Sequence, residues 1–160
     1  WKLRLRAVRR NRARQIRDAL FARQQFTERD LLAIQLDDRA VFLQRWWELL
    51  RAQAQGSKDP TWMAFESATR SWQGHAAANS VSYRLVHDWR VAVVERIKLG
   101  LLAPAIAKLG KDFVMPDLSQ LEGVAWQLVA QRPQHLLPRK FASWDALFLD
   151  AAQSRAQLRS

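Results

Sequence analysis

The sequence contains no cysteine and only five glycines and five prolines among its 160 residues. Without cysteine the chain cannot form disulfides, use a thiolate nucleophile or hold zinc through cysteine sulfur. The scarcity of glycine and proline, together with 49% hydrophobic residues, favours a globular helical protein. No apolar run approaches the roughly 20 residues that a membrane-spanning helix requires.

Motifs that mark common active sites are also missing. There is no Gly-x-Ser-x-Gly elbow, no phosphate-binding loop and no dinucleotide fingerprint. The three histidines, His75, His87 and His135, lack the spacing of metal ligands. Asp37 and Asp38 would point about 100° apart on a helix, which does not suit an acid/base pair. From its residues alone, the chain is therefore not an enzyme.

Positive charge, in contrast, is in excess. The net charge is +11 at pH 7, and residues 1–23 carry nine basic side chains against one acidic side chain, Asp18. An arginine-rich helix of this kind suits nucleic acid or an acidic neighbouring protein, and it equally suits a solvated surface. No nucleic-acid-binding motif accompanies the charge, so the three interpretations stay open.

Residues 12–50 predict two long helices joined by a short turn. At about 100° per residue, Arg12 lies in the middle of an apolar arc, whereas Arg10 and Arg14 point elsewhere. A guanidinium in an apolar stripe needs a carboxylate, backbone carbonyls or a functional site as its partner, because an uncompensated buried charge costs several kcal/mol. The arc consists of Leu5, Val8, Ile16, Ala19 and Leu20.

The second of these helices is expected to begin at Thr27, whose side chain can cap the first turn. Asp30 follows three residues later and completes an approximate capping box. Apolar residues on two sides predict a helix packed between neighbours, and therefore the spine of the domain. Asp38 and Arg45 lie on one of its apolar arcs, so both need partners.

Further helices are predicted where a capping residue precedes an apolar stripe. The expected elements are a helix from Asp59-Pro60 to near Gly74, a helix from Ser80 to Gly100, a short helical piece over 104–109, a loop over 111–117, a helix over about 118–131 that Pro133 ends, and a last helix capped by Ser143. The tryptophans at 46, 47, 62, 72, 126 and 144 are interpreted as core residues rather than stacking platforms for a ligand.

Three stretches of the chain carry a pattern that resembles the penicillin acylase family. The first has Arg12 four residues before Ile16, then Leu20, and a Gln-Leu-Asp box over 35–37 on the next helix. The second is Trp-Gln-Gly over 72–74, followed by Ser80; Gln73 stands where the family has an aspartate, so no function is carried over to it. The third is Leu-Leu-Pro over 136–138, followed by Ser-Trp-Asp over 143–145. Their order and spacing make the resemblance specific.

The resemblance implies both a fold and a reaction. It implies a mainly α domain, residues 1–160, excised from the β-chain of an N-terminal nucleophile (αββα) hydrolase. Such enzymes mature by autocleavage, and the serine that begins the β-chain attacks an amide with its own α-amino group as base. Trp1 is no such nucleophile, so this segment alone is expected to be inactive. The implied substrates are N-acylated small molecules, namely β-lactam antibiotics or acyl-homoserine lactones.

The resemblance also assigns one site residue and a set of partners. Arg12 corresponds to a family arginine near the oxyanion site, which orients catalytic groups and attracts a substrate carboxylate. The expected partners are the rest of the β-chain, the α-chain and a small-molecule amide, with neither a membrane nor nucleic acid. A periplasmic or secreted enzyme is implied, with no cofactor or metal in this segment and a structural calcium ion only in the rest of the enzyme. The alternative is a basic helical binding module for nucleic acid or an acidic protein partner.

Overall fold

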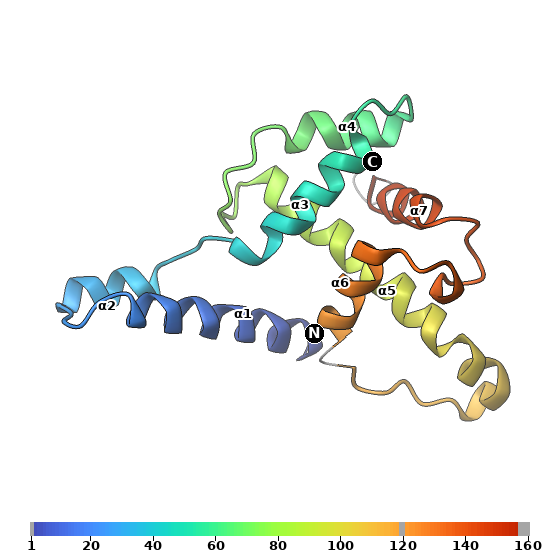
Figure 1. Cartoon of the computed structure of the whole chain (residues 1–160), viewed down its shortest axis with the longest axis horizontal. Coiled ribbons are helices and arrows are strands. Elements are labelled where there is room, and N and C mark those ends of the chain that lie inside the picture. Colours follow the sequence, from blue (N-terminus) through green and yellow to red (C-terminus); the bar gives the residue numbers. More distant parts are fainter. Residues whose placement is uncertain (1, 119–120, 157–160) are drawn as a thin grey trace.

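A computed structural model describes the backbone of residues 2–118 and 121–156, and the side chains of residues 12–118 and 121–155. Within these ranges all regular structure is helical, which confirms the predicted mainly α fold (Figure 1). The elements are α1 (Lys2–Phe21), α2 (Glu28–Gln35), α3 (Val41–Ala54), α4 (Pro60–Thr69), α5 (Val81–Leu109), α6 (Leu121–Gln131) and α7 (Trp144–Ala156), with short 3-10 turns at Gly110–Asp112 and Gln134–Leu136. None of the helices in the described ranges is long and apolar enough to cross a membrane.

Helices α1 and α2 form a hairpin that projects from the body made by the other helices (Figure 1). The turn between them ends at Thr27, as the sequence predicts. The Thr27 hydroxyl accepts a hydrogen bond from the Asp30 amide at 3.2 Å, and the Asp30 carboxylate accepts one from the Thr27 amide at 3.0 Å. The capping box is therefore confirmed.

The prediction of one long second helix is wrong, because the chain leaves the helix over residues 36–40 and starts α3 in a new direction (Figure 1). The carbonyls of Ile34 and Gln35, which a continued helix would pair with residues 38 and 39, accept instead from the Arg12 guanidinium. The Asp37 side chain accepts from the amide of Arg39 at 3.1 Å, a local contact that competes with helical pairing. The prediction that this helix is the spine of the domain is also wrong, because α2 buries no residue.

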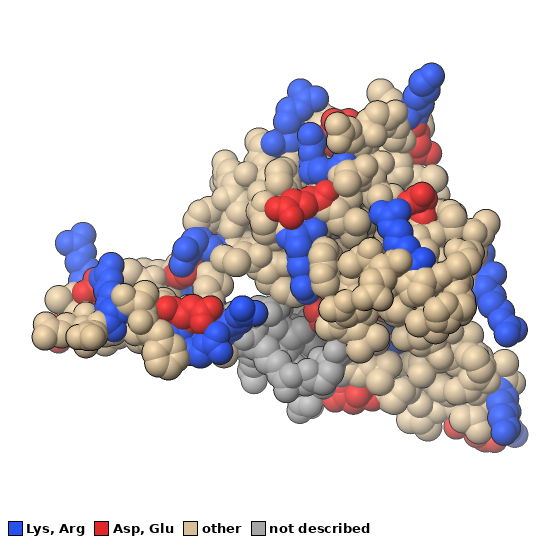
Figure 2. Space-filling view, in the orientation of Figure 1, with Lys and Arg blue, Asp and Glu red and all other residues tan. Residues whose placement is uncertain are grey.

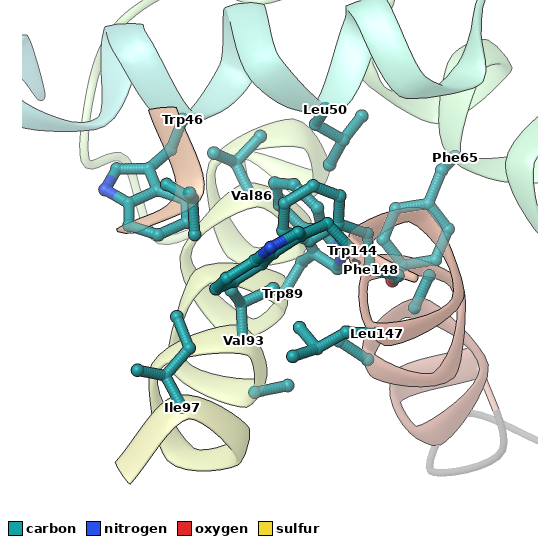
Figure 3. Close-up of a cluster of buried hydrophobic side chains, with 14 of the residues drawn as sticks. Trp46, Leu50, Phe65, Val86, Trp89, Val93, Ile97, Trp144, Leu147 and Phe148 are labelled. Atoms are coloured by element: carbon teal, nitrogen blue, oxygen red, sulfur yellow. Dashed lines mark hydrogen bonds between the residues drawn. The ribbon is translucent and has the colours of Figure 1, made fainter. Parts of the chain in front are cut away.

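The spine is α5, which packs against α3, α4, α6 and α7. Trp89 occupies the centre of the hydrophobic core (Figure 3). Its ring lies 6.1 Å from the ring of Trp46, 6.0 Å from that of Trp62 and 5.9 Å from that of Phe148. Its indole N–H donates to the Phe148 carbonyl at 3.1 Å, which satisfies the buried donor. The tryptophans predicted for the core lie in it or against it.

The predicted end of a helix at Gly100 is also wrong, since α5 continues to Leu109 and ends at Gly110, whose φ is 53°. A Cβ atom at Gly100 would lie 2.4 Å from Cγ of Pro138, so glycine is needed there for close packing. The segment predicted as a separate piece over 104–109 is the last part of α5. Pro104 is tolerated within the helix at the loss of one backbone hydrogen bond.

The remaining capping predictions are confirmed. Asp59 caps α4 through its carboxylate, Ser80 caps α5 by accepting from Tyr83, and Ser143 accepts from the amide of Ala146 at the start of α7. Helix α4 ends at Thr69, five residues before the predicted end. Helix α6 begins at Leu121, and residues 119–120 of its predicted first turn lie outside the described residues.

Candidate functional site

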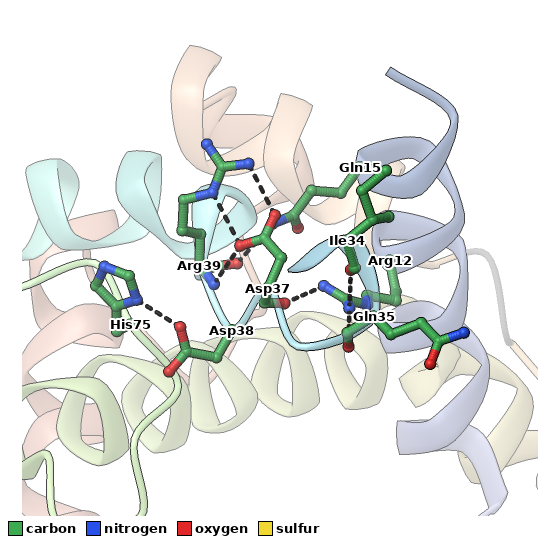
Figure 4. Close-up of polar contacts among 8 residues, drawn as sticks. All are labelled: Arg12, Gln15, Ile34, Gln35, Asp37, Asp38, Arg39 and His75. Atoms are coloured by element: carbon green, nitrogen blue, oxygen red, sulfur yellow. Dashed lines mark hydrogen bonds and ion pairs between the residues drawn. The ribbon is translucent and has the colours of Figure 1, made fainter. Parts of the chain in front are cut away.

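Arg12 joins α1 to the end of α2 (Figure 4). Its guanidinium donates to the carbonyls of Ile34 at 2.8 Å, Gln35 at 2.6 Å and Asp37. The last carbonyls of a helix have no partner within the helix and carry the negative end of its dipole. Arg12 therefore caps the C-terminus of α2. Of the three kinds of partner that the sequence allowed, the structure shows backbone carbonyls, and no described carboxylate pairs with this guanidinium.

Asp37 is the most highly bonded carboxylate at this junction (Figure 4). It accepts from Gln15 at 2.8 Å and from the Arg39 guanidinium at 2.8 and 2.7 Å, and its side chain is only 13% exposed. The hydrogen bonds from Arg39 hold the pKa of Asp37 well below its usual range, against the opposing effect of burial. Asp37 is therefore ionised throughout the neutral and mildly acidic range.

The segment of residues 36–40, here called the linker, is also bound to the connector between α4 and α5. The Ala40 amide donates to the Gly74 carbonyl at 2.6 Å, and the Ala76 amide donates to the Asp38 carbonyl at 2.8 Å. The imidazole of His75 contacts the Asp38 carboxylate at 2.5 Å (Figure 4). Asp38 thus has a partner, but the apolar helical position predicted for it is wrong, because it lies outside the helices and its side chain is 52% exposed. Asp37 and Asp38 thus bind different groups and do not act as a pair.

A hollow of about 170 Å³ lies beside the junction. Arg12, Asp37 and Gln15 form one part of its wall, while Tyr83 and His87 of α5 belong to another. The rings of Tyr83 and His87 are stacked, with centroids 6.0 Å apart. Burial raises the pKa of Tyr83. Apolar side chains also line the hollow, namely Ala40, Phe42, Leu43 and Ala76, so it combines apolar and aromatic groups with strongly polar ones.

A second polar cluster connects α3, α5 and α6 and contains a residue that the sequence reasoning missed. Arg90, which is 9% exposed, binds the Glu122 carboxylate, and that carboxylate also accepts from the Trp46 indole at 3.0 Å. Arg45 approaches Glu122 at 3.7 Å and lies 4.3 Å from the ring of Trp126. Glu122 is thus the partner that Arg45 was expected to need. Burial lowers the pKa of the Arg45 guanidinium, which stays charged.

The sequence contains a signal that marks Arg90 as a residue in need of a partner. It lies four residues after Val86 and three before Val93, both of which are buried, so it falls on the apolar face of its helix as Arg12 does on the first. The test that singled out Arg12 would have found it. Its carboxylate partner, thirty-two residues away on another helix, could not have been chosen from the sequence.

The basic N-terminal stretch is partly neutralised by its own acidic residues. Asp18 pairs with Arg17 at 2.6 Å and with Arg14 at 3.7 Å, and Asp30 pairs with Arg23 at 2.6 Å. Basic and acidic side chains are interspersed on the hairpin (Figure 2). The side chains of residues 1–11, among them Arg10 and two members of the predicted apolar arc, lie outside the described residues. The binding-module alternative stays a prediction.

No metal site emerges from the part of the chain that the structure describes, because no group of three or more histidine, aspartate or glutamate side chains there could hold an ion. No curated protein and no solved structure matches the chain. A family model described as penicillin amidase matches residues 4–158, which include Arg12, the linker and all of the described core. The chain therefore belongs to the penicillin amidase family.

Proposed function

We propose that the chain is the helical part of the β-chain of an N-terminal nucleophile hydrolase that cleaves the amide bond of N-acylated small molecules. The family match over residues 4–158 carries this proposal. The nucleophile belongs to a part of the enzyme outside this chain, and the rest of the β-chain and the α-chain complete the active site. β-Lactam antibiotics or acyl-homoserine lactones are the proposed substrates, and the periplasm or the exterior is the proposed location.

Within this enzyme, Arg12 is proposed to lie near the oxyanion site. Its bonds to three carbonyls hold the guanidinium in place, and it lines the hollow beside the linker. An arginine side chain has five N–H donors, so donors remain for a group supplied by the rest of the enzyme. A permanently charged group that is already fixed needs little rearrangement when negative charge develops nearby during amide cleavage.

The nature of the enzyme can be tested on the intact protein with its upstream sequence. Mass spectrometry of the purified enzyme should find a processed chain that begins with serine, and the enzyme should hydrolyse a phenylacetyl amide or an acyl-homoserine lactone. Replacing that serine by alanine should abolish both processing and hydrolysis. The 160-residue chain by itself should show no turnover.

The opposite result would favour the basic binding module. An unprocessed protein without amidase activity, retained on DNA in a manner that weakens steeply with salt, would indicate phosphate contacts and counterion release. The pairing of Arg14, Arg17 and Arg23 with Asp18 and Asp30 lowers the net positive charge of this part of the hairpin without removing it.

A further inference from the structure

We propose that Asp37 is a positioning residue for the proposed amide hydrolysis, because it fixes the guanidinium of Arg12. This inference rests on the proposed function of Arg12 and adds a second residue to it. Asp37 is suited to this task because it contacts two successive turns of α1. Its carbonyl accepts from Arg12, and its carboxylate accepts from Gln15 at 2.8 Å. Residues 12 and 15 lie on the same face of the helix.

The carboxylate is held so tightly that the peptide group of Asp37 has little freedom. Besides Gln15, it accepts from the amide of Arg39 at 3.1 Å and from two nitrogens of the Arg39 guanidinium (Figure 4). Two parallel bonds from a guanidinium fork fix orientation as well as distance. The carbonyl of Asp37 is therefore directed at Arg12 by contacts that lie on the other side of the residue.

Gln15 also fixes the position of Asp37 relative to Arg12, acting from the α1 side. Its amide nitrogen donates to the Asp37 carboxylate at 2.8 Å and to the Arg39 carbonyl at 3.2 Å. The linker is thus fastened to α1 at two points one turn apart, and a displacement of Asp37 would move the acceptor that Arg12 uses. The structure offers Arg12 no carboxylate among the described residues that could hold it in another way.

The test compares Asp37→Asn with Asp18→Asn in the intact enzyme. The control is matched, because Asp18 also binds the Nε and an Nη of an arginine, Arg17, at 2.9 and 2.6 Å, but its side chain is 54% exposed. We expect Asp37→Asn to lower kcat by about tenfold with KM changed less than twofold, and Asp18→Asn to leave both unchanged. Active sites are counted by titration, so that kcat refers to folded enzyme only.

Combining Asp37→Asn with Arg12→Lys separates positioning from independent effects. If Asp37 acts through Arg12, the double variant should be no slower than the slower single variant, because coupled residues are non-additive. Multiplied losses would overturn the inference, and so would normal kcat in Asp37→Asn alongside a slow Arg12→Lys, although the role of Arg12 would then stand. Normal kcat in both single variants would instead refute the role proposed for Arg12.

Gln15→Ala provides a second route if Asp37→Asn does not yield folded enzyme. It leaves the Asp37 carboxylate and its bonds to Arg39 intact and removes only the two hydrogen bonds that Gln15 donates, one to that carboxylate and one to the Arg39 carbonyl. It should lower kcat in the same direction by about threefold, with KM and the number of titratable active sites unchanged. A loss of active sites without a change in kcat per site would show a purely structural role and overturn the inference.

Discussion

Replacing Arg12 by lysine tests the proposed role of this residue most directly. The guanidinium spans three carbonyls, two at the end of α2 and one in the linker. A lysine ammonium is a single nitrogen on a flexible stem and cannot reproduce the planar fork. We expect it to keep about one of the three hydrogen bonds and to lose the fixed fork of donors that is proposed to serve the oxyanion site.

The size of the effect follows from these contacts. Each lost hydrogen bond is worth about 0.5–1.5 kcal/mol net, so the loss of two destabilises the junction of α1 with the linker by roughly 1–3 kcal/mol. If Arg12 also serves the reaction, kcat/KM should fall by about tenfold or more, which corresponds to about 1.4 kcal/mol of transition-state stabilisation. The variant should therefore show both a lower melting temperature and slower turnover per active site.

Arg14→Lys is the matched control for this measurement. Arg14 lies half a turn further along α1, its side chain is 77% exposed, and its partner is the nearby Asp18 at 3.7 Å. It should change neither kcat/KM nor the melting temperature appreciably, since exposed pairs contribute little. If Arg12→Lys lowers the melting temperature while folded enzyme keeps its specific activity, Arg12 is only a helix cap and the proposed role in catalysis is refuted.

Three further predictions concern stability, each measured by equilibrium urea unfolding. Gly100→Ala should lower the free energy of unfolding by about 1–3 kcal/mol, because the new Cβ would overlap Pro138. An unchanged midpoint of urea unfolding would contradict this packing. Glu122→Ala should cost about 3 kcal/mol, since it leaves two arginines without their carboxylate, whereas Asp145→Ala, at an exposed pair, should cost less than about 1 kcal/mol. Because the pKa of Asp37 is lowered on folding, its contribution is present above about pH 4 and is lost as the pH falls. The stability difference between wild type and Asp37→Asn should therefore be constant from about pH 5 to 8 and shrink below about pH 4.

Most helix starts could be predicted because their cause lies within a few residues of sequence. Thr27, Asp59, Ser80 and Ser143 each accept hydrogen bonds from amides of the turn that they precede. Such contacts need no tertiary partner, so the sequence contains all the information. The mainly α class follows from the same local signals, while the assignment of residues 1–160 to one domain stays a prediction.

Two of the helix ends that were predicted wrongly, that of α2 and the one expected at Gly100, involve residues elsewhere in the chain. The end of α2 depends on Arg12, which is more than twenty residues away. At Gly100 the close contact is with Pro138, which takes the space that a side chain would fill. Glycine therefore marks close packing inside α5 rather than the end of the helix, and the residue that it contacts is distant in sequence. Periodicity cannot supply such partners.

The apolar arc of the first helix predicted correctly that Arg12 has a partner. The apolar pattern of residues 28–50, in contrast, predicted an unbroken helix that the structure does not have. A guanidinium on an apolar arc must have a partner, and this requirement holds whichever partner is found. The apolar residues of 28–50, in contrast, satisfy a helical period only if the helix is unbroken. Leu36 and Val41 fit that period, yet they lie at the break and are 71% and 61% exposed.

The two parts of the family resemblance in residues 12–50, the arginine four residues before Ile16 and the Gln-Leu-Asp box, are far apart in sequence. In the folded chain they touch: Arg12 donates to the carbonyls of Gln35 and Asp37, the first and last residues of the box. They are therefore the two sides of one contact, which ends α2, fixes the linker and holds a charged group beside the hollow. A substitution on either side should therefore alter the effect of a substitution on the other, and the double variant of Arg12 and Asp37 measures this coupling.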